Sequence, residues 1–149
     1  MEENPKIIPE NFHLFHLKII ESNIASPSNI KDLNYKIDVA HTTMHNTDQK
    51  RIKIGLMVSI LGVKDDKDTD VKAFFNIDFH YIIDDFERFY EINEKEHLTF
   101  NGTFISVLLG VSYSTARGVI YERLNDTSLE GVILPIVSPA KMLTTRKQV

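Results

Sequence analysis

Six histidines are the side chains in this 149-residue chain best suited to bind a metal ion. His13 and His16 stand three positions apart in a predicted strand over residues 12–20, so we expect them on opposite faces, where they cannot share an ion. His41 and His45 have a ligand spacing typical of helices but stand at the end of another predicted strand. Because a metal site needs three or four converging ligands, the pattern favours histidines on the surface or at a sheet edge and predicts no metal.

Acidic and hydroxyl side chains are further candidates for metal binding or catalysis, and in each case a residue that the site requires is missing from the sequence pattern. Residues 66–70 (DKDTD) begin like a calcium-binding loop, yet Val71 and Ile77 stand where that loop needs a glycine and a glutamate. Ser112 lacks the G-x-S-x-G context of a nucleophile. The carboxylates of residues 84–91 are better explained as a solvated acidic face than as an acid–base pair. With no cysteine and no glycine-rich phosphate loop, the sequence predicts a protein that is not an enzyme and has no cofactor.

The composition is that of one folded domain over residues 1–149. Hydrophobic residues make up 42% and charged residues 26%, which is typical of a globular protein. A net charge of −4 gives no reason to expect nucleic acid as a partner. The N-terminal residues lack the basic start of a signal peptide, and apolar stretches such as 54–63 and 131–137 are too short to cross a bilayer. We therefore expect a cytoplasmic protein with no membrane insertion.

Four segments in the first half of the chain have the pattern of β-strands. Residues 33–44, 51–63 and 69–83 alternate apolar and polar side chains, as half-buried strands do. Residues 12–20 are the predicted first strand. The polar segments between the later strands are short, so we expect these strands to pair antiparallel in sequence order. The first strand, followed by a longer loop, is expected at one edge or the other.

The second half changes to the period of a helix. From Phe104 onward apolar side chains recur every three or four residues, with Asn101 or Thr103 as the predicted N-cap. Residues 84–98 form the predicted crossover between sheet and helix. Residues 131–137 contain a proline and are expected to be an extended segment on the core. The expected buried stripe of the helix is Phe104, Val107, Leu108, Val111, Thr115 and Val119.

Apolar side chains are more numerous than one helix can cover. Phe74 and Ile82 stand on the second face of the last predicted strand, and Met57 and Leu61 on that of the strand before it. One helix covers one face of a four-stranded sheet, so we expect the other face to contact a partner. A homo-oligomer interface is the simpler interpretation, and a substrate surface is compatible with it.

Several segments together resemble the SecB export chaperones. Residues 115–120 (TARGVI) are similar to the family's Y-A-R-E-x-I helix motif, and residues 129–137 resemble its F-P-x-L-x-L-x-P-V segment. Residues 12–14 and Ser26-Pro27 are similar to the family's first strand and its exit, and residues 91–101 look like the crossover of shorter SecB-like proteins. The resemblance covers most of the chain. It implies an α+β fold: a four-stranded antiparallel sheet, a long helix and an extended, proline-containing C-terminal segment.

The resemblance also implies roles for particular residues. The surface that contacts the SecA motor in the family corresponds here to Glu21, Phe74 and Asn76. Ala25 and Asn76 replace two of that surface's three acids, so we expect contact with SecA to be weak or lost. The second helix of typical members is expected to be mostly absent, because only residues 140–149 remain for it. The fourth-strand positions for oligomerisation or polypeptide binding are Phe75, Ile77, Phe79 and Tyr81.

The sequence therefore predicts a SecB-like holdase that binds unfolded or extended polypeptide without nucleotide and assembles as a dimer or tetramer. A role in protein export is one interpretation of this prediction. The alternative is an adaptor of the same fold that binds one dedicated partner, such as a toxin–antitoxin component. A small-molecule enzyme is the third and least favoured interpretation.

Overall fold

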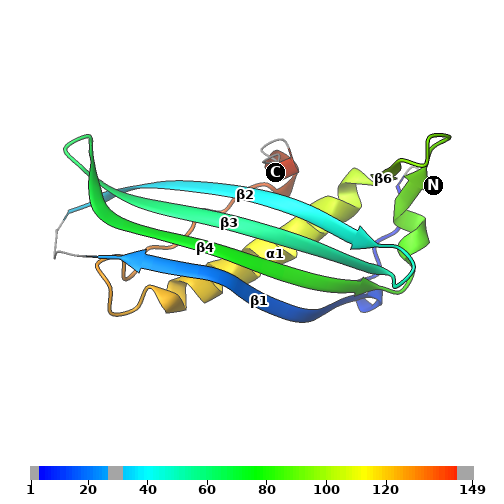
Figure 1. Cartoon of the computed structure of the whole chain (residues 1–149), viewed down its shortest axis with the longest axis horizontal. Helices are drawn as coiled ribbons and strands as arrows, with labels where there is room; N and C mark the ends of the chain where they lie inside the picture. The colour runs from blue at the N-terminus through cyan, green and yellow to red at the C-terminus, as the bar shows by residue number, and fades with distance from the viewer. Residues whose placement is uncertain (1–3, 27–31, 144–149) are drawn as a thin grey trace.

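A large antiparallel sheet dominates the computed structural model, which describes residues 4–26 and 32–143. Its strands are β1 (Phe12–Ala25), β2 (Asn34–Asn46), β3 (Arg51–Lys64) and β4 (Lys67–Ile83). They lie in the order β1-β4-β3-β2, each antiparallel to its neighbour (Figure 1). The four predicted strands are confirmed, and β1 takes the edge beside β4, which gives a Greek-key order.

The sheet has two different faces, here called inner and outer. Every second side chain of β4 from Val71 to Ile83 is buried on the inner face, and so is every second side chain of β3 from Ile52 to Ile60. Residues directly opposite each other on antiparallel strands point to the same side. The outer face is therefore formed by the residues that alternate with these, including Met57 and Phe74.

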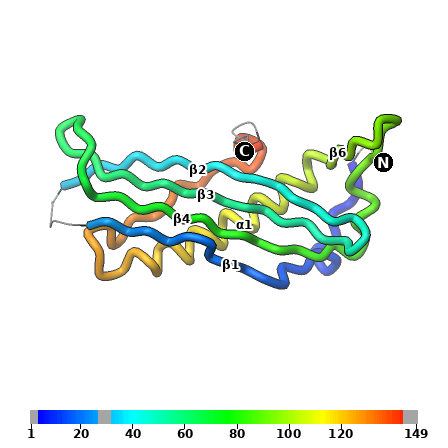
Figure 2. The backbone as a smooth tube through the Cα atoms, viewed as in Figure 1, coloured from blue at the N-terminus to red at the C-terminus, as the bar shows by residue number. Residues whose placement is uncertain are grey.

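One long helix, α1 (Gly102–Arg123), covers the inner face and runs diagonally behind the sheet in Figures 1 and 2. Asn101 caps it, as one of the two predicted N-caps, by accepting a hydrogen bond from the Phe104 backbone N–H at 3.0 Å. By length and mean hydropathy α1 could also span a membrane. Its buried side chains pack against the sheet, which is the arrangement of a core helix.

The buried stripe of α1 differs from the predicted one. Phe104 and Leu108 are buried as expected, but Val111 is 45% exposed. The side of α1 that packs on the sheet is therefore rotated relative to the predicted stripe. The buried helix side chains are Phe104, Ile105, Leu108, Leu109, Ser112, Tyr113, Ala116 and Ile120.

The predicted crossover between sheet and helix docks on the core through aromatic rings. It contains the 3₁₀ helix η2 (Phe86–Phe89) and a small hairpin of β5 (Tyr90–Ile92) and β6 (Leu98–Phe100). Phe89 stacks on Phe104 with ring centroids 4.5 Å apart. Phe12, at the start of β1, meets both rings edge-on at 5.6 Å. This cluster fixes the start of α1 against the end of the sheet.

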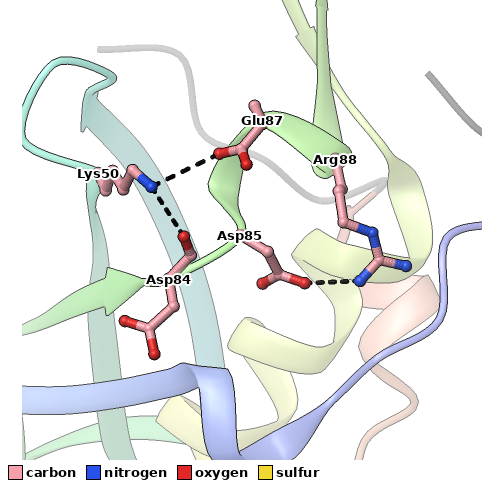
Figure 3. A network of polar contacts seen from close by, with 5 residues as sticks. All are labelled: Lys50, Asp84, Asp85, Glu87 and Arg88. Carbon is pink, nitrogen blue, oxygen red and sulfur yellow. Dashed lines mark hydrogen bonds and ion pairs between the residues drawn. The ribbon is translucent and has the colours of Figure 1, made fainter.

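Polar contacts hold the start of the crossover to the β2–β3 turn (Figure 3). The Lys50 Nζ donates a hydrogen bond to the Asp84 carbonyl oxygen at 2.9 Å and lies 3.8 Å from the Glu87 carboxylate. Arg88 and Asp85 form an ion pair at 2.6 Å. Of the acidic residues in this region, Asp85 and Glu87 thus contact cations through their carboxylates, and Asp84 accepts a hydrogen bond at its backbone carbonyl.

The C-terminal segment lies beside α1, as the sequence predicts, and ends in the short helix α2 (Pro139–Leu143). Leu129 and Leu134 bury their side chains in the core. Tyr113 donates a hydrogen bond to the Pro135 carbonyl oxygen at 2.5 Å, and Arg117 donates one to the Leu134 carbonyl at 2.9 Å. Two side chains of the long helix therefore hold this segment by its backbone.

Candidate functional site

The four side chains predicted as a polypeptide-binding or oligomer face lie in the core. They point to the inner face, under α1, and each is at most 2% exposed. This placement corrects the expectation that they are available to a partner. The more apolar side of β4 is the side that folding buries, because removing it from water stabilises the fold most. These four residues are Phe75, Ile77, Phe79 and Tyr81.

Tyr81 and Ser112 form a closed hydrogen-bonded contact between the sheet and α1. Their hydroxyl oxygens are 2.7 Å apart, and the Tyr81 hydroxyl lies 3.4 Å from the Leu108 carbonyl oxygen. Burial raises the pKa of Tyr81 to about 12. A neutral phenol is not a general base at physiological pH. Ser112 is therefore part of the core and has no activating partner in this pair.

The three residues that the SecB resemblance assigns to motor contact come together on the outer face. Glu21 lies directly opposite Asn76 across β1 and β4, and Asn23 lies opposite Phe74 two positions along, in the next pair on the same face. A hollow of about 460 Å³ is bounded by these strands and β3, with Glu21 and Phe74 in its lining. The structure thus groups these side chains at one place, while their role in motor contact stays a prediction.

Two hollows on the inner side follow the edge strand β2, and we call them together the edge groove. The first, about 260 Å³, is lined by Ile37, Asp38, Val39, Tyr113, Pro135, Val137, Lys141 and Met142. The second, about 320 Å³, is lined by His41, Thr43, Leu98, Thr99, Phe100, Gly102, Ile105 and Leu143. Side chains of α2 contribute to both hollows, so this short helix lies between them.

The walls of the edge groove come from distant parts of the chain. One wall is β2, and the other is made by α1, the β6 strand and the C-terminal segment. His41 crosses between the walls, because its Nε2 is 2.6 Å from the Met142 carbonyl oxygen. At 2% exposure His41 is a core residue, which corrects the expectation of a surface or edge histidine. No local pattern predicts this contact, since its partners are 101 residues apart.

The first two histidines also differ from expectation. His13 lies opposite Ile82 and His16 opposite His80, and both of these partners belong to the outer face. A register shift between Leu14 and His16 adds one residue to β1, so the side chains of His13 and His16 both point to the outer face. His13 and His16 therefore share a face, contrary to the prediction. Within residues 4–26 and 32–143, no group of three or more histidine or acidic side chains is placed to hold a metal.

Comparison with known proteins supports the fold assignment. No family model and no curated protein matches the sequence. Among solved structures, the chain is similar to the Mycobacterium tuberculosis SecB-like chaperone Rv1957, solved in complex with a ChAD peptide from the Rv1956 HigA1 antitoxin. The identity is 11% and the TM-score 0.62, over 86% of this chain and 92% of that chain. The similarity confirms the predicted SecB-like fold.

A protein of unknown function from Streptococcus agalactiae is a weaker match. It shares 10% identity over 84% of this chain and 97% of that chain, with a TM-score of 0.38. A score this low carries no argument about this chain.

Proposed function

We propose that this SecB-like domain is a holdase that binds an extended, apolar polypeptide segment in the edge groove. The position of the groove beside β2 supports this most directly. β2 pairs with β3 on one side, and among the described residues no strand pairs with its other side. An extended peptide can add to such an edge by backbone hydrogen bonds and place alternate side chains in pockets.

The lining of the groove suits apolar side chains of many shapes. Val39, Val137 and Met142 line the first hollow, and Phe100 and Leu143 the second. Methionine and leucine side chains adapt to varied partners through rotamer changes. Backbone pairing adds binding energy that does not depend on the peptide's sequence. We therefore expect capture of many unfolded chains, with no requirement for ATP.

An adaptor that binds one dedicated partner is the second candidate. It is favoured by the solved neighbour, which is a SecB-like chaperone in complex with a peptide from an antitoxin. The same groove would serve, because a defined peptide and an unfolded client both present extended backbone. Pull-down from the organism's own cytosol distinguishes the two: many unfolded precursors support a holdase, and one stoichiometric protein supports an adaptor.

Aspartate substitutions in the groove test its role. Val137→Asp and Leu143→Asp place a charge where an apolar client would cover it, and burying an unpaired charge is costly. We expect each to weaken binding of a labelled, extended apolar peptide by about tenfold or more, measured by fluorescence anisotropy. Turbidity of a reduced, aggregating test protein should rise in parallel, equally with and without ATP.

Met44→Asp is the matched control for these variants. Met44 belongs to β2 but is 61% exposed on the outer face, so the substitution introduces the same charge outside the groove. It should leave peptide binding unchanged. If the groove variants bind the peptide as the wild type does while Met44→Asp weakens binding, the client site lies on the outer face and this proposal fails.

A general role in export through SecA is less well supported than holding. Asn76 and Ala25 stand where the family has acids, and Lys72 lies opposite Ala25 on the same face. A basic motor segment meets less attraction on such a surface. We therefore keep the expectation that any contact with SecA is weak, and calorimetry with the host's SecA tail tests it.

A further inference from the structure

The end of the outer face near the β2–β3 turn carries a cluster of basic side chains. On the outer face, Arg51 of β3 lies opposite Ile82 of β4, and Lys53 lies opposite His80 in the next pair on that face. One outer-face position further along β4, Asp78 lies opposite Lys18 of β1. Three cations thus occupy neighbouring positions with a single carboxylate among them. The chain as a whole has a net charge of −4, so this surface has the opposite sign to the molecule that carries it.

The geometry of the cluster leaves its positive charge only partly neutralised. Asp78 lies 3.5 Å from Lys53, which compensates one cation. Arg51 instead lies over the ring of Phe15, with its guanidinium carbon 5.0 Å from the ring centroid. A guanidinium stacked on a ring keeps its edge donors for a further carboxylate. Burial lowers the pKa of His80, so His80 is a neutral hydrogen-bonding group here at physiological pH.

An apolar hollow lies within the same cluster. It has a volume of about 170 Å³, and its lining includes Phe15, Met44, Arg51, Lys53 and His80. Phe15 is 44% exposed and Met44 is 61% exposed. Phe15 faces outward because the register shift in β1 places it where the regular alternation is interrupted. A partner therefore meets cations and exposed apolar side chains together.

We propose that this surface, called the basic outer patch, docks an acidic segment of a partner protein that carries an apolar side chain beside its carboxylates. The carboxylates would pair with Arg51 and Lys53, and the apolar side chain would enter the hollow beside Phe15. Charge complementarity favours an acidic peptide, since opposite charges steer encounter and suppress wrong partners. The patch is separate from the edge groove, which lies on the inner side of the sheet.

Other anionic occupants fit the patch less well. Nucleic acid binding draws on many phosphate contacts by a row of basic side chains, and here three cations surround one carboxylate. A second copy could offer the acidic β3–β4 hairpin tip at the far end of its sheet, where Asp65, Asp66, Asp68 and Asp70 gather. That tip lacks an apolar side chain for the hollow between its aspartates.

Synthetic peptides test the proposal directly. Two labelled peptides of equal length and apolar content, one with glutamates and one with lysines at the charged positions, are titrated with the full chain by fluorescence anisotropy. We expect the acidic peptide to bind and the basic one to bind at least about tenfold more weakly, with a difference that shrinks as salt is added. Equal binding of the two peptides would overturn the proposal.

Paired variants locate the site. Arg51→Glu with Lys53→Glu should reduce affinity for the acidic peptide by about tenfold or more, and the neutral pair Arg51→Gln with Lys53→Gln should reduce it less. Lys36→Glu is the matched control, since Lys36 is an exposed cation on the outer face of β2 at the other end of the sheet. Its effect should be small. Loss of binding in Lys36→Glu, or none in the paired variants, would overturn the proposal.

Two further arms identify a different occupant. A labelled single-stranded oligonucleotide that binds more tightly than the acidic peptide would overturn the assignment to a protein partner. A fall in molecular mass by light scattering in the paired variants, without peptide binding to the wild type, would show a contact between copies instead. Apolar-client binding in the paired variants should match the wild type, so failure of this proposal and failure of the groove proposal are distinguishable.

Discussion

At the scale of single residues, buried hydroxyls and one histidine carry the contacts that tie distant segments together. Tyr81 forms a hydrogen bond with Ser112 across the sheet–helix interface, and Tyr113 donates a hydrogen bond to the Pro135 carbonyl oxygen. His41 forms a hydrogen bond with the Met142 carbonyl oxygen. Each of these side chains makes a hydrogen bond to a partner far away in sequence, which offsets part of the cost of burying a polar group. The Tyr113 and His41 contacts hold the C-terminal segment in place and so shape the edge groove.

Replacing Tyr81 with phenylalanine should remove part of the protein's loss of stability at alkaline pH. The folded-state pKa of about 12 lies above the ordinary value of 10. Because the pKa is raised in the folded state, the neutral phenol contributes fully to the free energy of unfolding below pH 10, and this contribution is lost as the pH rises toward 12. The free energy of unfolding should therefore fall more steeply over this range in the wild type than in Tyr81→Phe.

Urea unfolding at neutral pH and across the alkaline range measures both parts of this prediction. At neutral pH the variant should be less stable by about 1 kcal/mol, because the hydrogen bond to Ser112 is lost. Ser112 can turn to a backbone carbonyl one helical turn back, which keeps the cost small. Parallel pH profiles for the two proteins would show that Tyr81 does not titrate as its burial implies.

At the scale of elements, strand register decides which side chains share a surface. The two register shifts in β1, between Leu14 and His16 and between Ile19 and Glu21, each change which residues face outward. They bring His13, His16, Lys18 and Glu21 to the outer face together. A regular strand would alternate these positions between the two faces. This irregularity places Phe15 and Lys18 of β1 on the same face as Arg51 and Lys53 of β3 and so completes the basic outer patch.

Gly55 offers a direct test of the register between β2 and β3. It lies opposite Thr42, and a methyl group added at Gly55 would lie 2.5 Å from the Thr42 Oγ1 and 3.3 Å from an Asp78 carboxylate oxygen. Gly55→Ala should therefore lower the free energy of unfolding by about 1–3 kcal/mol, as overpacking does. In a Thr42→Ala background the same substitution should cost much less. A double-mutant cycle measured by denaturant unfolding should show this coupling, and additive effects would contradict the pairing.

At the scale of the whole molecule, apolar surface remains after the core is complete. Val111 and Tyr121 are more than 40% exposed on the free side of α1, and Ile133 and Ile136 are 60% and 88% exposed on the C-terminal segment. One side of α1 packs on the sheet, and no element of the described chain covers the opposite side, so its apolar side chains stay exposed to solvent. We propose that it forms a homo-oligomer interface, in a dimer or a tetramer.

Light scattering at micromolar concentration tests this assembly. The wild type should have a mass well above the 17.1 kDa of one chain. Val111→Asp should lower the mass, because it places a charge in the proposed interface while leaving the core untouched. Lys36→Glu, at an exposed position on the outer face of β2 away from α1, serves as a control for added negative charge. A monomeric wild type throughout the range would refute the homo-oligomer.

The strands and the long helix could be predicted from the sequence, because periodicity is a local signal. The alternation in residues 69–83 predicted β4, and the change of period after Asn101 predicted the cap and start of α1. The resemblance to SecB implies the same order of elements and the same extended C-terminal segment, and the fold confirms both. These features depend on neighbours a few positions apart, and such neighbours are visible in the sequence.

Which surfaces stay exposed depends on how the elements pack together and could not be predicted from the sequence. Alternation shows that β4 has two faces but not which one α1 covers, so it does not predict that Phe75 and the other inner-face residues of β4 are buried under the helix. The bulges of β1 and the His41–Met142 contact also have no local signature. The helix packs where the most apolar area leaves water, and that choice depends on all elements at once. The edge groove and the basic outer patch follow from that choice.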